Sequence, residues 1–270
     1  MGREKQEDLG SALFIAPGER DPLRAVAEGG KLKKLARFYK TVAVAPQAQG
    51  FAVLLDGKPL RTPARAPLLL PSEALAQAVA REWEEQAEHV DPAKMPLTRL
   101  ANTAIDGVAA RMAEVEADAA KYAAADLVCY RAGDPEALVA AQNEAWDPLL
   151  AFIRERHGAR FSLSEGVIHH AQPEETLAAI GRLLHETVGE GAAAPFRLAG
   201  IHAMTTLSGS LVVALTTALR HIDADAGFAA AHVDEDYQLR VWGPDAEALA
   251  RRARRLEEMR AAALCVALAG

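Results

Sequence analysis

The side chains that most often form metal-binding or reactive centres are few in this sequence and poorly spaced for such chemistry. The chain has eight histidines and two cysteines, but no His-Glu-x-x-His or Cys-x-x-Cys arrangement that would bring zinc ligands together. His169 and His170 are adjacent, so on a strand they would point to opposite faces. Cys129 has no histidine near it in the sequence, which favours burial as a small apolar residue. We therefore expect no metal site.

Two further patterns resemble catalytic or nucleotide-binding loops only loosely. Ser208 lies in the sequence Leu-Ser-Gly-Ser-Leu, which lacks the glycine two residues before the serine that a nucleophile elbow requires. The glycine-rich segment 189–194 follows a helical pattern rather than a strand, so a pyrophosphate would find no strand-to-helix turn there. An interhelical loop explains it better. The sequence thus predicts no catalytic residue and no cofactor, and it favours an interaction protein over an enzyme.

Three consecutive acids stand out near the carboxy terminus. Asp234, Glu235 and Asp236 lie in a helical pattern that also carries Tyr237 and Trp242. Consecutive residues are about 100° apart around a helix, so at least one of the carboxylates must approach the buried side. A solvated acidic face, a contact with a basic partner surface and a pairing with an internal arginine are all compatible with this pattern.

The following helical segment is rich in arginine between residues 251 and 255. This cluster fits a solvated helical face better than a phosphate site, because three acids near it in the sequence can partly neutralise it. Those acids are Glu247, Glu257 and Glu258.

Length and charge limit the classes of protein that could position these residues. The chain has 270 residues, half of them apolar, and a formal net charge of −7. This length is enough for a large core and for two domains, whereas an acidic chain is a poor candidate for nucleic-acid binding. No apolar run approaches the ~20 residues of a membrane helix. We expect a soluble intracellular globular protein without membrane insertion.

The amino-terminal part is predicted to hold a small antiparallel sheet. Acids scattered through residues 1–30 argue against a targeting signal, and we expect a flexible leader there. Residues 31–96 are expected to form a small α+β domain. Apolar residues alternate between 37 and 71, and Asp56-Gly57 is a typical two-residue hairpin turn, which predicts an antiparallel β-meander.

A helix starting after Ser72 should cover this sheet. Leu75, Val79 and Trp83 recur at helical spacing on one face, while Glu82 is expected to point away from that face, as are Glu85 and Glu88.

The remaining residues, 97–270, are predicted to form a larger, mostly α-helical domain. The expected helical segments are 97–127, a helix starting at Asp134-Pro135 that kinks or restarts at Pro148, 177–188, 196–206, 210–220, 228–242 and one running from 245. The predicted fold class is therefore α+β.

Several short motifs occur in the same order as in a known family. They are Arg37-Phe38-Tyr39-Lys40, the run from Leu55 to Pro63, Glu82-Trp83 with Gln86, Asp91-Pro92 with the run from Met95 to Arg99, the run from Asn102 to Asp106, the run from Asp126 to Ala132, Gln142 with Trp146-Asp147-Pro148, Gly209-Ser210, and Trp242-Gly243 with Asp245 and Glu247. From about residue 36 to its end, the chain resembles the ATP synthase assembly chaperones that bind the free α subunit of the catalytic head.

This resemblance implies a chaperone without enzymatic activity whose client is the ATP synthase α subunit. The family's functionally critical acid falls on Asp234, with Glu235 as the adjacent alternative; Asp236 completes the cluster, and Tyr237 and Trp242 are supporting residues. Tyr237 stands where relatives often have tryptophan. The expected site of action is the bacterial cytoplasm, or the mitochondrial matrix for a processed eukaryotic form, and a monomer is expected. A cofactor-independent hydrolase and an adaptor for another protein are the alternative functions.

Overall fold

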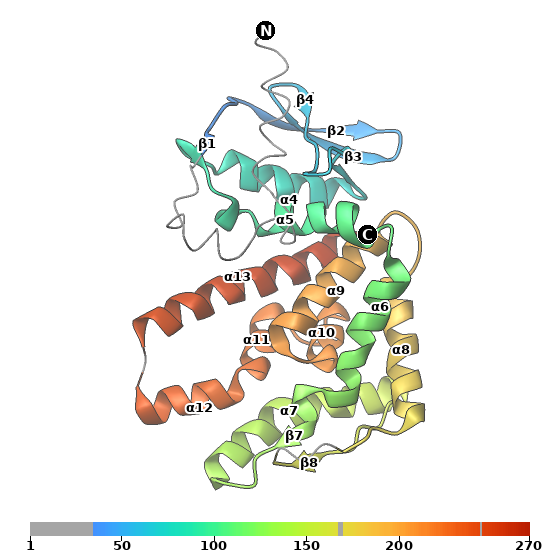
Figure 1. Cartoon of the computed structure of the whole chain (residues 1–270), viewed down its shortest axis with the longest axis vertical. Coiled ribbons are helices and arrows are strands. Elements are labelled where there is room, and N and C mark those ends of the chain that lie inside the picture. Colours follow the sequence, from blue (N-terminus) through green and yellow to red (C-terminus); the bar gives the residue numbers. More distant parts are fainter. Residues whose placement is uncertain (1–34, 167–169, 244) are drawn as a thin grey trace, which may run out of the picture. The chain divides into compact units, whose positions relative to one another are not determined.

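The computed structural model describes residues 35–166, 170–243 and 245–270, and the expected leader at 1–30 lies outside these ranges. The chain divides into two compact units (Figure 1). We call Met1–Ala110 with Leu268–Gly270 the amino-terminal unit, and Arg111–Ala267 the helical unit.

The amino-terminal unit contains the predicted antiparallel meander. Its central strand β3 pairs with the three other strands of this sheet. Asp56 and Gly57 have φ values of 48° and 78°, as a two-residue hairpin turn requires. The strands are β2 (Val42–Gln47), β3 (Gly50–Leu55), β4 (Lys58–Pro59) and β5 (Leu69–Leu70), and a separate two-stranded ladder joins β1 (Leu35–Ala36) to β6 (His89–Val90).

Helix α4 (Glu73–Glu84) covers this sheet as predicted and contacts β2, β3 and β5. The Ser72 hydroxyl caps it by accepting a hydrogen bond from the backbone N–H of Leu75 at 3.1 Å. Val79 and Trp83 are buried, and the Tyr39 hydroxyl donates to the Trp83 carbonyl at 2.6 Å. The apolar stripe read from the sequence is therefore the buried face of this helix.

The expectation that Glu82 points away from the core is wrong. Its carboxylate is buried and accepts the backbone N–H groups of Leu97 and Thr98 at 2.7 and 2.8 Å, and the Thr98 hydroxyl at 2.7 Å. These donors begin helix α5 (Pro96–Thr103), whose own cap residue, Met95, makes no side-chain cap bond. Burial raises the pKa of Glu82, while the hydrogen bonds oppose that shift. Helical spacing could not reveal this partner, which lies fifteen residues further along the chain.

The single helix expected over 97–127 is interrupted. After α5 the backbone forms a wider π-type turn at Ala104–Val108, and α6 begins only at Met112. The Asp106 carboxylate in this turn accepts the Thr62 hydroxyl at 2.6 Å and the Ala64 N–H at 3.0 Å. This tie to the loop after β4, together with the poor helix propensity of Gly107, accounts for the interruption.

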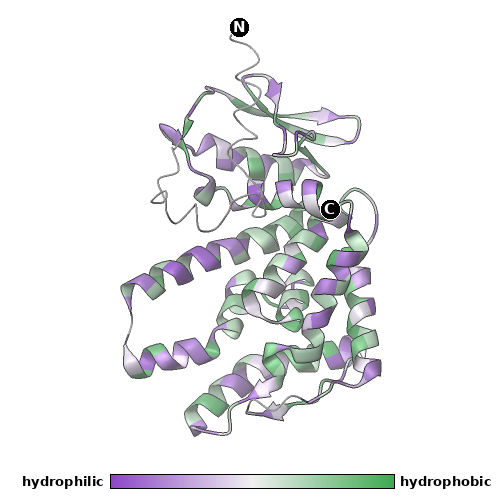
Figure 2. Cartoon of the chain, in the orientation of Figure 1, coloured by the Kyte–Doolittle hydropathy of each residue, from purple (hydrophilic) through white to green (hydrophobic). Residues whose placement is uncertain are grey.

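The helical unit is built around α10, which contacts α7, α8, α9 and α11. Residues 211–215 are fully buried, and Figure 2 colours this region as hydrophobic. The helices are α6 (Met112–Lys121), α7 (Glu136–His157), α8 (Glu174–Val188), α9 (Ala194–Ser208), α10 (Leu211–Ala218), α11 (Ala224–Ala231), α12 (Val233–Trp242) and α13 (Ala246–Leu268), with a short parallel ladder of β7 (Tyr130–Arg131) and β8 (Ser164–Glu165). The predicted α+β fold class, a small sheet region followed by a mostly helical one, is confirmed.

Two helix boundaries differ from the prediction. Of the two alternatives at Pro148, a restart does not occur, since α7 is continuous through it; Pro135 occupies the cap position before α7 rather than its first turn. The helix expected over 228–242 is two helices that meet at His232. The His232 ring bonds back to the Phe228 carbonyl at 2.7 Å, which ends α11 before α12 begins.

A buried aspartate fixes the start of the central helix. The carboxylate of Asp126, fully buried, accepts the backbone N–H groups of Val128 at 3.3 Å and Val212 at 3.0 Å, and it also bonds the Ser210 side chain. Burial raises the pKa of Asp126 to about 6, against the lowering effect of these hydrogen bonds. At neutral pH the carboxylate is therefore mostly ionised, and it accepts the Val212 N–H at the amino terminus of α10.

We predict that Asp126→Asn lowers the free energy of unfolding at pH 7.5 by ~1–3 kcal/mol, because one oxygen becomes an NH2 group and leaves a buried donor unsatisfied. Urea unfolding followed by circular dichroism measures this. Asp118→Asn, at a side chain that is 53% exposed, is the matched control and should change stability by less than ~0.5 kcal/mol. Equal stabilities of the two variants would contradict the assigned role of Asp126.

Candidate functional site: the groove between α12 and α13

The three consecutive acids at the start of α12 point toward different surroundings. Asp234 accepts a hydrogen bond from the Gln142 side-chain amide of α7 at 2.7 Å. Asp236 forms an ion pair with Arg252 of α13 at 2.7 Å. Glu235 is 58% exposed, with one oxygen 3.4 Å from Nε2 of His232. Two of the acids therefore connect α12 to neighbouring helices, and one faces solvent.

Helix α12 has very little apolar attachment. Val233 is the one buried residue among its ten. Tyr237 is partly buried, with the Arg240 guanidinium 5.7 Å from its ring centroid. Trp242 at the other end is 84% exposed and the neighbouring Val241 is 54% exposed. The helix is held at its amino-terminal end and presents large apolar side chains at its carboxy-terminal end.

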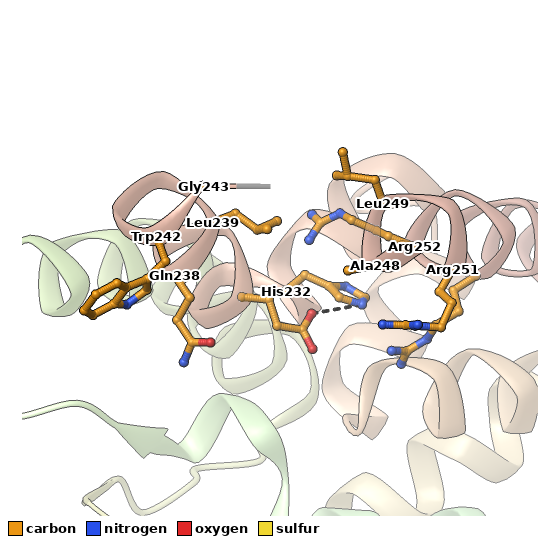
Figure 3. A pocket seen from close by; sticks show the side chains of 11 residues that line it. His232, Gln238, Leu239, Trp242, Gly243, Ala248, Leu249, Arg251 and Arg252 are labelled. Atoms are coloured by element: carbon orange, nitrogen blue, oxygen red, sulfur yellow. Dashed lines mark ion pairs between the residues drawn. The ribbon is translucent and has the colours of Figure 1, made fainter. Parts of the chain in front are cut away.

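Helices α12 and α13 enclose an open groove of about 430 Å³ (Figure 3). His232 lies at its centre in this view, with Gln238 and Trp242 on one side and Arg251 on the other. Its lining combines apolar and charged side chains: His232, Glu235, Gln238, Leu239, Trp242, Gly243, Ala248, Leu249, Arg251, Arg252 and Arg255.

The arginine cluster forms the basic wall of this groove. Arg251 pairs with Glu247 on its own helix at 2.6 Å, and Arg252 pairs with Asp236. Arg255 donates to the Leu207 carbonyl of α9 at 2.7 Å and has no carboxylate partner in the part of the chain that the structure describes. The prediction of a solvated helical face is thus wrong for Arg252, whose side chain is only 24% exposed.

His232 is almost fully buried at the junction of α11 and α12. Desolvation is the main cause that lowers the pKa of His232, and the positive charges of Arg252 and Arg255 lower it further. The hydrogen bond to the Phe228 carbonyl and the negative charge of Glu235 oppose this shift. The ring is therefore neutral at pH 7, and its Nδ1–H donates to the Phe228 carbonyl.

Sequence reasoning missed several residues of this site. His232, Leu239 and Leu249 carried no motif, and Gln142 belonged to a matching segment without an assigned role. Gln142 and Asp234 are 92 positions apart, so no local pattern could pair them. The ordered motifs were the one available signal, since they include Gln142 and Trp242.

The side chains considered as reactive centres serve structural purposes. The Ser208 hydroxyl donates to the Met204 carbonyl at 2.7 Å, and Ser210 caps α10 through the Val213 N–H at 3.0 Å. Cys129 and Cys265 are buried, which raises the pKa of both thiols to about 12. Gly189 and Gly191 lie between α8 and α9, as predicted for an interhelical loop. No group of three or more His, Cys, Asp or Glu side chains within the described ranges is arranged to hold a metal ion.

Comparison with known proteins shows which family has this architecture. The family model described as ATP12 chaperone protein matches residues 36–154. The crystal structure of Atp12 from Paracoccus denitrificans is 41% identical, with a TM-score of 0.79 over 87% of this chain and 99% of that one. The chain belongs to the ATP12 chaperone family.

Two further similar proteins agree with this assignment. The structure of an Agrobacterium tumefaciens protein described as a chaperone candidate is 44% identical, with a TM-score of 0.84 over 98% of this chain and 97% of that one. Mitochondrial atp12 of Schizosaccharomyces pombe (strain 972) is 24% identical over 219 residues, covering 77% of this chain and 73% of the yeast protein. The resemblance read from the motifs is confirmed, and the chain is an ATP synthase assembly chaperone.

Across the described ranges, no helix combines the length and the apolar character needed to cross a bilayer.

The buried neutral histidine predicts a pH-dependent stability. The folded-state pKa of His232 lies below its usual 6.5. As the pH falls through about 6.5, the unfolded state therefore binds more protons than the folded state, and the free energy of unfolding decreases. Urea unfolding at pH 7.5 and 5.5 measures the change in stability, to which the raised pKa of Asp126 contributes with the opposite sign. Relative to the wild type, His232→Gln should lose less stability on acidification, whereas His170→Gln, at an exposed position, should behave like the wild type. A loss of the same size in His232→Gln would show that other groups cause it.

Proposed function

We propose that this chain binds the unassembled α subunit of ATP synthase, covers its subunit-interface surface and releases it when the catalytic head assembles. The observation that carries the proposal is membership of the ATP12 family, with 41% and 44% identity to solved bacterial relatives over nearly their whole lengths. These bacterial relatives favour the bacterial cytoplasm as the site of action. One chaperone chain is proposed to act as a monomer on one client.

The client's physical problem explains what the chaperone must do. A free subunit exposes apolar surface that its neighbour later covers, and such surface aggregates. A useful chaperone therefore binds firmly enough to prevent aggregation and still yields to the proper neighbour. Charged side chains around a few apolar anchors provide fast encounter and specificity without a large apolar interface. The end of α12, with Trp242 and Val241 exposed beside charged residues, has this composition.

The three acids receive different roles in this proposal. Asp234 is a positioning residue, since its hydrogen bond from Gln142 holds the start of α12 against α7. Asp236 holds the same helix to Arg252 of α13. Glu235, exposed on the groove, is the acid that touches the client. Tyr237 and Trp242 support the contact, Trp242 as its exposed aromatic anchor.

We further propose that the chain makes and breaks no covalent bond. Its relatives are named as chaperones. The hydroxyls of Ser208 and Ser210 serve helix ends, and both thiols are buried. The candidate nucleophiles therefore have structural roles that account for their positions.

Co-expression with the α subunit tests the function and the role of Asp234 together. The wild-type chain should increase the amount of soluble α. Asp234→Lys should lose this effect, because lysine cannot accept the hydrogen bond from Gln142. Losing ~1–2 kcal/mol of attachment lowers the ratio of docked to undocked α12 by a factor of 5–30. Asp234→Asn should keep it, since the Asn carbonyl oxygen can still accept from Gln142.

Glu144→Lys, at an exposed acid on α7, makes the same charge change as Asp234→Lys and is the matched control; it should behave like the wild type. A folded Asp234→Lys chain that keeps α soluble would contradict the role of Asp234. Failure of Asp234→Asn would show that the charge itself contacts the client. No effect of the wild-type chain on soluble α would reject the proposed function.

A further inference from the structure

The groove between α12 and α13 has the opposite charge character from the chain as a whole. The chain carries a formal net charge of −7, yet three arginines and a single carboxylate, Glu235, line the groove. An acidic chaperone would be expected to attract a basic client surface. The groove instead favours a ligand that brings negative charge.

The three groove arginines differ in how far their guanidinium groups are already engaged within the chain. Arg252 is held by Asp236 and lies 5.4 Å from the Phe228 ring centroid, so it is part of the wall. Arg251 is 53% exposed at its side chain although it pairs with Glu247. Arg255 donates to the Leu207 carbonyl through one nitrogen. A guanidinium has five N–H donors, so Arg255 keeps donors that a carboxylate could accept in a bidentate pair.

Apolar side chains lie beside these donors. Leu239 and Trp242 from α12 and Leu249 from α13 line the same groove. Trp242 is 84% exposed and Leu249 is 44% exposed. Tryptophan and arginine are among the residue types that contribute most binding energy at protein interfaces. A volume of about 430 Å³ falls in the range of small-ligand sites, roughly 300–1,000 Å³. The groove therefore fits a few side chains of a peptide segment rather than a folded domain.

We propose that this groove binds an acidic segment of the client, in which an aspartate or glutamate pairs with Arg255 and Arg251 and a neighbouring apolar side chain packs against Trp242, Leu239 and Leu249. The inference rests on the proposed function, because it names the part of the α subunit that this surface recognises. Glu235, which touches the client from the opposite wall, repels the carboxylate of this segment and so directs it toward α13.

Charge reversal at two neighbouring arginines provides the first test. Arg254 lies on α13 beside Arg255 and is exposed, but it does not line the groove. Purified α subunit is titrated into the full-length chain and the dissociation constant is measured. Arg255→Glu should raise it ~10-fold or more, as loss of a charge pair at an interface does. Arg254→Glu, with the same change in net charge, should raise it less than ~2-fold.

The chemical class of the ligand is tested by cross-linking. Arg255→Lys keeps the positive charge and supplies an amine that a carbodiimide couples to a carboxylate in contact with it. Mass spectrometry should find a new amide between position 255 and an aspartate or glutamate of the α subunit. Arg254→Lys is the control and should give no comparable product.

Trp242 reports directly on occupation of the groove. It is the exposed one of three tryptophans, since Trp83 and Trp146 are each 1% exposed. In the chain labelled with 5-fluorotryptophan, unlabelled α subunit should shift or broaden the 19F resonance of Trp242, assigned with Trp242→Phe. The resonances of the two buried tryptophans should move less.

The outcomes separate this inference from the proposed function. If α binds the wild-type chain but both charge reversals weaken it equally, or the Trp242 resonance is unchanged, the groove inference is wrong and the proposed function stands. A cross-link from position 255 that never involves an acidic residue of α would also overturn it. If α does not bind the wild-type chain at all, the proposed function fails and the inference fails with it.

Discussion

The arrangement of the site depends on one constraint: a helix with almost no apolar attachment is held in place by its carboxylates. Helix α12 buries Val233 alone, so the hydrophobic effect contributes little to fixing it. Asp234 with Gln142 and Asp236 with Arg252 provide the polar links to α7 and α13. All three acids also lie in the first turn, where a negative charge is favourable for a helix. The opposite end of the helix is thereby left with Trp242 exposed.

The second wall of the groove is fixed in a different way. The carboxy-terminal half of α13 packs on α9 so closely that a Cβ atom at Gly200 would lie 2.8 Å from the Ala262 carbonyl oxygen and 2.6 Å from a Val266 methyl carbon. The amino-terminal half carries the arginines, and Arg255 ties it to the end of α9. Figure 2 shows the corresponding change along α13 from hydrophilic to hydrophobic. One wall is thus anchored by apolar packing and the other by ionic and amide contacts, which are weaker and more sensitive to salt.

Much of the fold was predictable because local chemistry determined it. The Asp56-Gly57 turn, the Ser72 cap, the Gly189 helix end and the apolar α10 each carry their signal within a few residues. The errors arose where a distant partner decided the outcome. Glu82 is buried because it caps a helix fifteen residues further on, and a side-chain bond at His232 divides one expected helix into two. Periodicity contains no information about such contacts.

The site was predictable only in part. The acid cluster and Trp242 were found from residue types and from the ordered motifs, and the helical geometry required one acid to approach the interior. The groove itself could not be predicted, because it forms only when Leu239 and Arg255 come together from two helices. The charge of the whole chain was misleading about this surface, since the basic wall occupies one face of a single helix.

Hydrogen–deuterium exchange of the chain with and without purified α subunit tests most directly whether the surface formed by α12 and α13 receives the client. Complex formation should slow exchange of backbone amides in residues 233–243 and in the first turns of α13, with little change in the buried α10. Unchanged exchange across α12 and α13, with protection confined to other parts of a complex that does form, would contradict the account.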